Sequence, residues 1–235
     1  MTGREGIKYS VIIPALNEAE AIGACMASVD TGGGKLELIV ADGGSTDGTP
    51  AKAKQGGAKL VSSGGGRGAQ MNAGAAGARG AILVFLHADT RLPSNWLAVL
   101  EAAFAHRGTE AGTFRLRFEP RLWALRPSEW LSRFDSVFTS FGDQGIAIRR
   151  PLFEALGGFP AWPLFEDVCL LQKARKRTRV VSLPAEVVTS SRRFQQAGVL
   201  RQKALNARLL FLYLAGASPE ALAERYRRRA PEQAR

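Results

Sequence analysis

Acidic residues stand at three points of the sequence where a predicted strand or loop ends. Asp42 and Asp89 come at the ends of two apolar strands, and the pair Glu166-Asp167 follows the loop 157–165. Carboxylates at the carboxyl ends of parallel strands in an open α/β sheet face the crevice in which ligands bind. Three such positions suit a nucleotide, a divalent metal ion and a proton acceptor.

The first half of the chain alternates between strand-like and helix-like segments. Short β-branched apolar runs predict buried strands, and the segments between them predict helices. Strands are expected at 9–13, 36–40, 59–61 and 81–86, and helices at 17–29, 49–55, 69–78 and 95–106, with Asn17 as the N-cap of the first helix. This order predicts an α/β fold with a doubly wound, mostly parallel sheet.

The second half of the chain has a less regular pattern. Short strands are expected at 113–118, 145–148, 180–183 and 186–188, and helices at 128–138, 151–156, 167–177 and 196–214, with a further helix starting at Ser218-Pro219. The helix 196–214 combines leucines with arginines and a lysine. Such a stripe either packs on the core or lies on an anionic membrane.

The net charge of +11 is concentrated in the second half. Residues 1–110 carry 10 Lys+Arg and 10 Asp+Glu, whereas residues 111–235 carry 22 and 11. The excess suits nucleic acid, an anionic membrane surface or a phosphorylated substrate, or else forms a basic solvated face. Nucleic acid is disfavoured because the basic residues are not interleaved with aromatic ones on a recognisable binding module.

The expected location is the cytoplasm, with peripheral contact to the inner face of the membrane as an option. No apolar run of the 235 residues is long enough to span a bilayer, and the start of the chain has no signal-peptide pattern. The two cysteines form no disulfide framework. The oligomeric state is left open.

A glycine-rich segment, 64–68, leads into the predicted helix 69–78. Such a loop lets backbone N–H groups approach phosphate oxygens. It is not a P-loop, because no Lys-Ser/Thr pair follows the glycines. Arg67 within the loop is a candidate contact to a phosphate.

The first two strand ends carry a recognisable pair of motifs. Pro14-Ala15-Leu16-Asn17-Glu18 closes the first strand, and Ala-Asp-Gly-Gly-Ser-Thr-Asp-Gly-Thr at 41–49 closes the second. Together with Asp89 they closely resemble the nucleotide-sugar-binding half of family 2 of the inverting glycosyltransferases, which have a GT-A fold. The resemblance extends from about Tyr9 to about Arg193, and its combination of motifs is specific although no single piece is.

The resemblance implies a domain plan. A GT-A domain would occupy 1–194, with a nucleotide-sugar half at about 7–110 and an acceptor half at about 111–194. Basic amphipathic helices would form a C-terminal extension at 195–235. Pro14, Leu16 and Glu18 would contribute to donor binding, and Asp42 would accept the imide N–H of a uracil. Asp42 could instead be an Asx-turn residue that only shapes its loop.

The segment His87-Ala88-Asp89 resembles the family's D-x-D element. Asp89 would bind a Mg²⁺ or Mn²⁺ ion that bridges the donor diphosphate, and such an ion neutralises the charge that builds on the leaving group. The chain departs from the pattern because His87 stands in the first Asp position. His87 as a ligand would favour Mn²⁺. The alternatives for His87 are a contact to ribose or phosphate, or no role.

The loop and helix at 67–74 resemble the family's R-G-x-x-x-N-x-G segment. The resemblance implies that Arg67 contacts the nucleotide or its diphosphate and that Asn72 supports the donor site. The alternative is a surface loop followed by a small-residue helix that packs tightly on the sheet.

The pair Glu166-Asp167 resembles the family's E-D motif. Asp167 would be the general base that takes the proton of the acceptor hydroxyl, and Glu166 would position the acceptor or the metal. Which of the two is the base stays open, and Asp167 could also serve as the N-cap of its helix.

The resemblance implies two further pairs of binding residues, one for the sugar and one for the diphosphate. Asp143 and Gln144 would bind sugar hydroxyls, or else belong to a polar turn. Arg192 and Arg193 would close over the diphosphate, because arginine pairs bind it with paired hydrogen bonds, or else form a solvated basic turn.

The resemblance narrows further across four short motifs. Phe-Leu-His-Ala-Asp-Thr at 85–90, Gly-Asp-Gln-Gly at 142–145, Glu-Asp-Val at 166–168 and Ser-Ser-Arg-Arg-Phe at 190–194 together look like a small bacterial subfamily. That subfamily takes its label from an association with radical-SAM or selenium-related genes and with arsenosugar biosynthesis.

The expected function is therefore the transfer of a sugar, with inversion, from a nucleoside-diphosphate sugar to a hydroxyl acceptor. UDP is the expected nucleotide. Two alternatives belong to other classes: a sugar nucleotidyltransferase, and a non-enzymatic peripheral membrane-binding protein that uses the basic C-terminal helices. Against the former, the first strand is not followed by a glycine-rich loop with a triphosphate-binding Arg or Lys.

Overall fold

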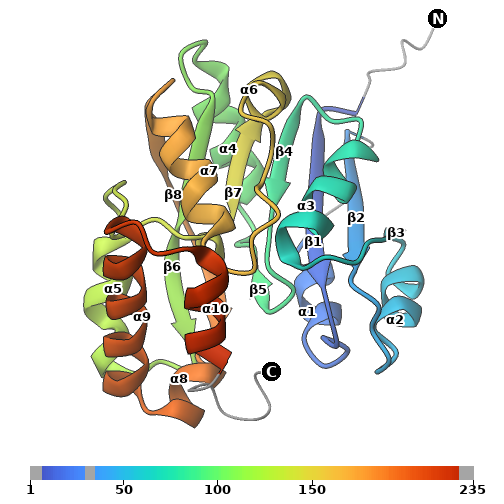
Figure 1. Ribbon diagram of the computed structural model, residues 1–235. Coiled ribbons are helices and arrows are strands. Elements are labelled where there is room, and N and C mark those ends of the chain that lie inside the picture. Colours follow the sequence, from blue (N-terminus) through green and yellow to red (C-terminus); the bar gives the residue numbers. More distant parts are fainter. Residues whose placement is uncertain (1–6, 30–34, 228–235) are drawn as a thin grey trace, which may run out of the picture.

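Four parallel strands form one half of the sheet, where the apolar runs of the first half predict them. They are β1 (Tyr9–Ala15), β2 (Leu36–Asp42), β3 (Lys59–Ser62) and β4 (Ile82–Phe85), in the order β3-β2-β1-β4 (Figure 1). The computed structural model describes residues 7–29 and 35–227. Every residue of β1 is buried, as expected for a strand with packed layers on both faces.

Helices cover both faces of the sheet and create two cores. One core includes α1 (Ile22–Ala27), α2 (Thr49–Gln55) and α4 (Trp96–Ala105), and the other includes α3 (Arg67–Ala76), α6 (Arg150–Ala155) and α7 (Glu166–Arg175). A Cβ at Gly74 of α3 would lie only 2.4 Å from Cγ2 of Ile12. The small-residue helix therefore lies directly on β1, which fixes the loop that precedes it.

The second half of the sheet is mixed. β7 (Ile146–Arg149) runs antiparallel to β4 and to β6 (Ala111–Glu119), while β8 (Val180–Ser190) runs parallel to β6. The two-residue β5 (Thr90–Arg91) pairs antiparallel with β8, so the full order is β3-β2-β1-β4-β7-β6-β8-β5. The expected α/β architecture with a mostly parallel sheet is confirmed.

The pairing of β5 with β8 brings distant parts of the chain together. Thr90 lies opposite Thr189, and their hydroxyl oxygens are 2.9 Å apart. The chain therefore crosses, within the few residues after β4, from the middle of the sheet to the end of β8. His87 and Asp89 lie on that crossing, close to the residues that follow β8.

Asn17 is not the N-cap of the first helix, which is a correction to the sequence prediction. It has a left-handed φ of +54°, and α1 begins only at Ile22. The Asn17 side chain accepts a hydrogen bond from the N–H of Thr46 at 2.9 Å, and its own N–H donates to Oγ of Ser45 at 2.9 Å. A neighbouring strand end, rather than the helix, is the partner of this residue.

Three predicted segments in the second half have different boundaries. Of the helix expected at 128–138 only 128–131 are helical, as the end of α5 (Arg126–Leu131), which η1 (Trp123–Leu125) precedes. The helix expected at 196–214 is divided into α8 (Arg192–Ala197) and α9 (Val199–Leu214). Gly198 separates the latter two with a φ of +82°. The two short strands expected at 180–183 and 186–188 join into β8, with a register shift opposite Phe114 and Arg115.

The C-terminal helices pack on the rest of the chain. The ring of Phe194 on α8 meets Phe118 edge-on at 5.4 Å, and the hydroxyl of Tyr213 on α9 donates to Oε1 of Gln172 at 3.0 Å. The last described helix, α10 (Pro219–Arg227), starts as predicted, with the N–H of Ala221 on Oγ of Ser218 at 3.3 Å. Residues 228–235 lie outside the described part.

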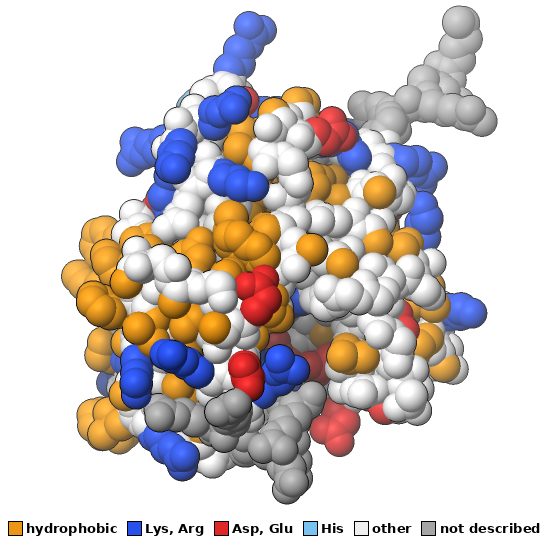
Figure 2. All heavy atoms as spheres, in the orientation of Figure 1, with side chains coloured by type: hydrophobic (Ala, Val, Ile, Leu, Met, Phe, Trp, Pro, Cys, Tyr) orange, Lys and Arg blue, Asp and Glu red, His pale blue; other side chains and the backbone are white. Residues whose placement is uncertain are grey.

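Hydrophobic side chains gather along the edge of the molecule that carries α5 and α9 (Figure 2). Among the described residues, none of the helices combines the length and the apolar character needed to cross a bilayer.

Candidate functional site

The carboxyl ends of β1 and β2 form one side of the candidate site. Ala15 pairs with Asp42 at the last position of both strands. The Asp42 carboxylate is buried and accepts the N–H groups of Gly44 at 3.0 Å and Ser45 at 3.1 Å. The Asx-turn arrangement considered from the sequence is therefore present, and a contact of Asp42 with a base stays a prediction.

The Asp47 carboxylate ties the loops after β1 and β2 together by accepting backbone N–H groups. Oδ2 of Asp47 accepts the N–H of Ala19 at 2.9 Å, and its Oδ1 accepts the N–H of Thr49 at 3.0 Å. Pro14 is buried at the end of β1, whereas Leu16 exposes 54% of its surface. This side of the site is a rigid frame with an apolar side chain left open to solvent.

Glu18 meets the residues that follow β8. An Nη2 of Arg192 lies 3.8 Å from Oε2 of Glu18, and the other Nη lies 4.0 Å from Oε2 of Glu20. Partial burial raises the pKa of Glu18, the charge of Asp89 raises it further, and Arg192 and Arg193 oppose that rise. Glu18, Asp89 and both arginines, all predicted from separate motifs, thus share one electrostatic environment.

His87 lies on the short segment that joins β4 to β5. Burial lowers its pKa well below the usual range, and the positive charges of Arg67 and Arg193 lower it further. The imidazole is therefore neutral near pH 7 and keeps a lone pair for a proton or a metal ion. Ala88 beside it is buried.

Arg67 and Glu166 form an ion pair between the starts of α3 and α7. Nε of Arg67 donates to Oε1 of Glu166, whose side chain is only 1% exposed. Burial by itself lowers the pKa of Arg67, but the charges of Glu166 and Asp167 outweigh burial and the net pKa is raised. Oε2 of Glu166 is buried with no hydrogen-bond partner among the described residues.

Asp167 is held by backbone N–H groups. Its Oδ2 accepts the N–H of Gly142 at 2.5 Å, and its Oδ1 accepts the N–H of Val168 at 2.8 Å. Phe165, with a left-handed φ of +64°, is the N-cap residue of α7. The suggestion that Asp167 is the N-cap is therefore wrong, because Asp167 lies in the first turn.

Gly142 is a site residue that the sequence analysis did not single out. A Cβ at this position would lie 2.9 Å from Oδ2 of Asp167 and 3.1 Å from Nε2 of His87. Any side chain would push these two groups apart. The Gly-Asp-Gln-Gly run at 142–145 was the signal in the sequence. It could not show that position 142 requires glycine, because that requirement comes from Asp167 and His87 in the folded chain.

Asp143 and Gln144 lie in η2 (Gly142–Gln144) and present unpaired acceptors. Oδ1 of Asp143 and Oε1 of Gln144 are buried and have no hydrogen-bond partner within the described part of the chain. Burial raises the pKa of Asp143 to about 7, Asp167 and Asp89 contribute to the rise, and Arg67 opposes it. Three carboxyl groups, of Glu166, Asp167 and Asp143, thus act on Arg67, and Asp89 is close enough to act on Asp143.

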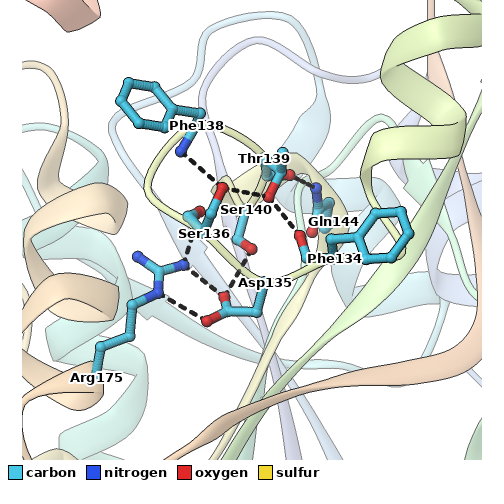
Figure 3. A network of polar contacts seen from close by, with 8 residues as sticks. All are labelled: Phe134, Asp135, Ser136, Phe138, Thr139, Ser140, Gln144 and Arg175. Carbon is cyan, nitrogen blue, oxygen red and sulfur yellow. Dashed lines mark hydrogen bonds and ion pairs between the residues drawn. The ribbon is translucent and has the colours of Figure 1, made fainter.

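A polar network holds this segment on α7 (Figure 3). Arg175 of α7 donates to both carboxylate oxygens of Asp135, at 2.9 and 2.6 Å, and Oγ of Ser140 donates to Oδ1 of Asp135 at 2.8 Å. The amide nitrogen of Gln144 donates to the carbonyl oxygen of Thr139. The network also replaces the last turns of the predicted helix 128–138.

Asn72 acts on the loop before α7. Its Nδ2 donates to the carbonyl oxygen of Phe159 at 2.8 Å, and its Oδ1 accepts the N–H of Phe159 at 3.0 Å. This paired contact holds the loop 157–165 against α3 and so helps to place Glu166 and Asp167. A direct contact of Asn72 with a donor molecule stays a prediction.

The side chains suit a divalent metal only in combination with a phosphorylated ligand. Within residues 7–29 and 35–227, no three His, Cys, Asp or Glu side chains converge closely enough to hold an ion. Mg²⁺ commonly takes one or two carboxylates from the protein and completes its shell with substrate phosphates and water. Asp89, with His87 two residues before it, fits such a shared site, and the unpaired oxygens of Asp143 and Glu166 leave room for further contacts.

Residues 10–153, well over half of the chain, match the model of the family described as Glycosyl transferase family 2. Among curated proteins, glucosyl-3-phosphoglycerate synthase of Mycolicibacterium smegmatis is 46% identical over 61 residues, which is 25% of this chain and 20% of that protein. The chain thus aligns with only about a fifth of this relative.

Two solved structures are similar in fold. A structure of S. aureus TarS, residues 1–349, has a TM-score of 0.64 at 20% identity and covers 78% of this chain and 60% of that one. Glucosyl-3-phosphoglycerate synthase from Mycobacterium tuberculosis, in complex with Mn²⁺, UDP and glucosyl-3-phosphoglycerate, has a TM-score of 0.64 at 22% identity and covers 88% of this chain and 79% of that one. The fold is the GT-A fold expected from the sequence, and the family match shows that the chain belongs to glycosyl transferase family 2.

Proposed function

We propose that the protein transfers a sugar, with inversion, from a UDP-sugar to a hydroxyl acceptor. The observation that carries this proposal is the clustering of Arg67 and neutral His87 with carboxyl groups from three separate segments of the chain. Three oxygens there, on Asp143, Gln144 and Glu166, are buried and find no partner within residues 7–29 and 35–227. Buried polar groups are nearly always paired, so unpaired ones in one cluster indicate a place for a polar ligand.

The nucleotide and the metal are proposed partly from related proteins. The M. tuberculosis synthase was solved with Mn²⁺ and UDP, and S. aureus TarS was solved with UDP-GlcNAc. The frame formed by the loops after β1 and β2 would hold the nucleoside, with Asp42 on the base and with Pro14, Leu16 and Glu18 beside it. Arg67, Arg192 and Arg193 would contact the diphosphate.

Asp89 would hold a Mn²⁺ or Mg²⁺ ion together with the donor diphosphate, and His87 is a further candidate ligand. When bound, the ion would supply positive charge at the diphosphate as the sugar leaves. The neutral state of His87 suits this role, because a metal ligand must offer a lone pair.

Asp167 is the proposed general base. The acceptor oxygen would form a bond to the anomeric carbon as the bond from that carbon to the diphosphate breaks, and the hydroxyl proton would pass to Asp167. The nucleoside diphosphate would leave with the electron pair. Two backbone N–H groups fix the Asp167 carboxylate, while Glu166 is bound to Arg67 and is better suited to positioning.

Asp143 competes for the role of base, because its pKa of about 7 is near the value that suits proton transfer at neutral pH. We assign it to the sugar hydroxyls together with Gln144. The transfer rates of the Asp143→Asn and Asp167→Asn variants separate the two assignments. If Asp143 is the base, Asp143→Asn will abolish transfer and Asp167→Asn will not.

Family membership gives the sugar nucleotidyltransferase alternative no support. The narrower subfamily linked to radical-SAM genes and arsenosugars, a cytoplasmic location, and the division into a GT-A domain over 1–194 and helices over 195–235 remain predictions. The identity of the sugar and the acceptor depends on a few hydroxyl contacts that the donor and acceptor loops provide.

Calorimetric titration of UDP tests the donor site directly. We expect binding with Mn²⁺ present, about tenfold or more weaker binding with EDTA, and the same weakening in Asp89→Ala with Mn²⁺. Glu101→Ala, a substitution on α4, serves as the matched control and should leave the affinity unchanged.

Three other results would redirect the proposal. Tighter binding of GDP than of UDP would make the donor a guanosine-linked sugar. UDP binding that EDTA does not affect would remove the metal from the mechanism. No binding of either nucleotide under any condition would contradict the transferase assignment.

A further inference from the structure

Exposed large hydrophobic side chains are concentrated in one short segment. Of nine such residues in the described part of the chain, five lie between positions 123 and 138: Trp123 at 83% exposure, Trp130 at 56%, Leu131 at 42%, Phe134 at 53% and Phe138 at 67%. Large apolar patches on soluble proteins mark protein or membrane interaction sites. None of these residues is part of the proposed donor site.

The outward direction of these rings is fixed by the inner face of the same segment. Leu125 and Ser132 are buried, Oγ of Ser132 accepts the N–H of Leu116 at 2.9 Å, and Oε1 of Glu129 accepts the N–H of Phe118 at 2.8 Å. These contacts pair the backbone of β6 beyond Thr113, where β7 no longer pairs with it. Because the inner face is committed to the sheet, η1 and α5 cannot rotate to hide their aromatic residues.

Three aromatic residues of this segment share the outer side of η1, α5 and the turn after them. Trp123 lies in η1, Trp130 in α5 and Phe134 in the turn that follows α5, and all three side chains are exposed. The rings of Trp130 and Phe134 meet nearly edge-on at 5.0 Å. Phe138 belongs to the loop beyond, and its ring points away from Phe134 across the polar network (Figure 3). We call Trp123, Trp130 and Phe134 the aromatic face.

Arginines border the aromatic face. Arg126 and Arg133 lie three positions after Trp123 and Trp130, and together with Arg117 and Arg121 they line a cavity of about 330 Å³ that has Trp130 as one wall. Two glutamates also line it, but Glu129 accepts a backbone N–H and Glu186 faces Arg133 at 3.9 Å. The cavity keeps a net positive charge.

We propose that the aromatic face and its arginine-lined cavity dock the protein on an anionic phospholipid bilayer. Tryptophan is enriched at the boundary between acyl chains and headgroups, where its ring is partly apolar and its N–H stays hydrated. Arginines beside such rings attract anionic headgroups, each contributing roughly 1 kcal/mol near the surface. The cavity is the place for a headgroup phosphate, to which guanidinium groups bind with paired hydrogen bonds.

Charge disfavours a second copy of the chain as the occupant. A symmetric dimer through this face would bring its arginines close to the same arginines of the other copy, and like charges across an interface oppose association. An anionic surface has the complementary charge. This inference does not depend on the proposed function, because no residue of the donor site takes part.

The location differs from the one that the sequence predicts. The helix α9 buries Leu209 and Leu210 against the domain, while Leu200 and Phe211 remain exposed at 74% and 71%. The leucine-rich stripe of α9 is thus partly core, and no pair of tryptophans accompanies it. Phe211 therefore provides a comparison, an exposed aromatic residue on the neighbouring α9 but outside the aromatic face.

Cosedimentation of the full chain with vesicles tests the proposal. We expect binding to phosphatidylglycerol vesicles, weak binding to phosphatidylcholine vesicles, and release at about 1 M NaCl, where the screening length is about 3 Å. Trp130→Ser/Phe134→Ser should weaken binding at least about tenfold, and Phe211→Ser less than about twofold.

A charge-matched pair gives a second readout. Arg126→Glu/Arg133→Glu should weaken vesicle binding about tenfold or more, whereas Arg201→Glu/Arg208→Glu on α9 changes the net charge equally and should weaken it only about two- to threefold. Both pairs are on exposed positions, and unchanged melting temperatures would show that each variant is folded.

Several results would overturn the proposal. They are equal binding to both vesicle types, full binding by Trp130→Ser/Phe134→Ser, or a larger loss in Phe211→Ser. Inorganic phosphate that releases the protein far better than NaCl of equal ionic strength would indicate a soluble phosphate site instead. A dimer in light scattering that Trp130→Ser/Phe134→Ser converts to monomer would assign the face to a second copy.

Discussion

The loops of the first half and those of the second half use their polar groups in different ways. After β1 and β2, the carboxylates of Asp42 and Asp47 accept backbone N–H groups of their own loop, and Asp47 also accepts one from the loop after β1. Around η2 and the start of α7, by contrast, Asp143, Gln144 and Glu166 each keep a buried oxygen that has no partner among the residues the structure describes. In the first region the carboxylates already have partners, whereas the second leaves acceptor oxygens open to a ligand.

Backbone strain follows the same division. Asn17 and Phe165 are the two described non-glycine residues with positive φ, at +54° and +64°. Asparagine tolerates this region, whereas a bulky residue such as phenylalanine does so at a cost. Strain of this kind persists where surrounding contacts enforce it and is concentrated at functional sites. The ring of Phe165 packs on Tyr213 at a centroid distance of 4.9 Å.

The largest effect is expected from Asp167→Asn, which removes the proposed proton acceptor. The rate of transfer should fall about 10³-fold, while UDP affinity changes less than about twofold, since general-base catalysis typically contributes 10²–10⁴-fold. Asp47→Asn alters a carboxylate of the frame that is likewise held by two backbone N–H groups. It should leave the rate within about threefold. Loss of UDP binding in Asp167→Asn would give Asp167 a structural role instead.

The stability of the ligand-free protein should depend on Asp143. Its pKa is raised from 3.8 to about 7 in the folded chain, so between these values the folded state holds a proton that the unfolded state lacks. Stability should therefore fall as the pH rises through this window, by at most about 4 kcal/mol at about 1.36 kcal/mol per pKa unit. Chemical denaturation of Asp143→Asn should show a flatter profile and greater stability near neutral pH. An unchanged profile would place the titration elsewhere.

Removal of the Arg67 guanidinium, which pairs with Glu166 at the start of α7, should destabilise the fold. Arg67→Met leaves the buried Glu166 without its partner, and we expect a loss of about 2–3 kcal/mol, less than the 3–5 of a fully buried pair because Arg67 is partly exposed. The matched control is Arg79→Met, whose pair with Glu37 involves a 72% exposed arginine side chain, and it should cost at most about 1 kcal/mol. Equal losses in both variants would mean that Arg67–Glu166 behaves as a surface pair.

The smallest effect is expected in the frame. Asn17→Ala removes the hydrogen bond to the N–H of Thr46 and places alanine at positive φ, so we expect a loss of about 1–2 kcal/mol in thermal or chemical denaturation. Asn17→Gly removes the same hydrogen bond without the backbone penalty and should cost about 1 kcal/mol less. A larger loss in Asn17→Gly than in Asn17→Ala would contradict this account.

The sequence by itself determined the parallel half of the sheet and the positions of most site residues. The β-branched runs at β1, β2 and β4 are long enough to predict strands, and a carboxylate after such a strand must lie at the carboxyl edge of the sheet. Asp42 and Asp89 could be named for this reason, whereas Arg67 and Asp167 were named from the resemblance of their motifs to those of the family. These are local signals, in which spacing along the chain gives position in space.

The tertiary structure decided how the second region is assembled. The pairing of β5 with β8, the Arg67–Glu166 ion pair and the Arg175–Asp135 contact join residues 99, 99 and 40 positions apart. The need for glycine at position 142, the raised pKa of Asp143 and the outward aromatic face of η1 and α5 all depend on which neighbours those contacts bring. Burial and charge act through space, so a linear pattern predicts the groups that take part but not which of them share an environment.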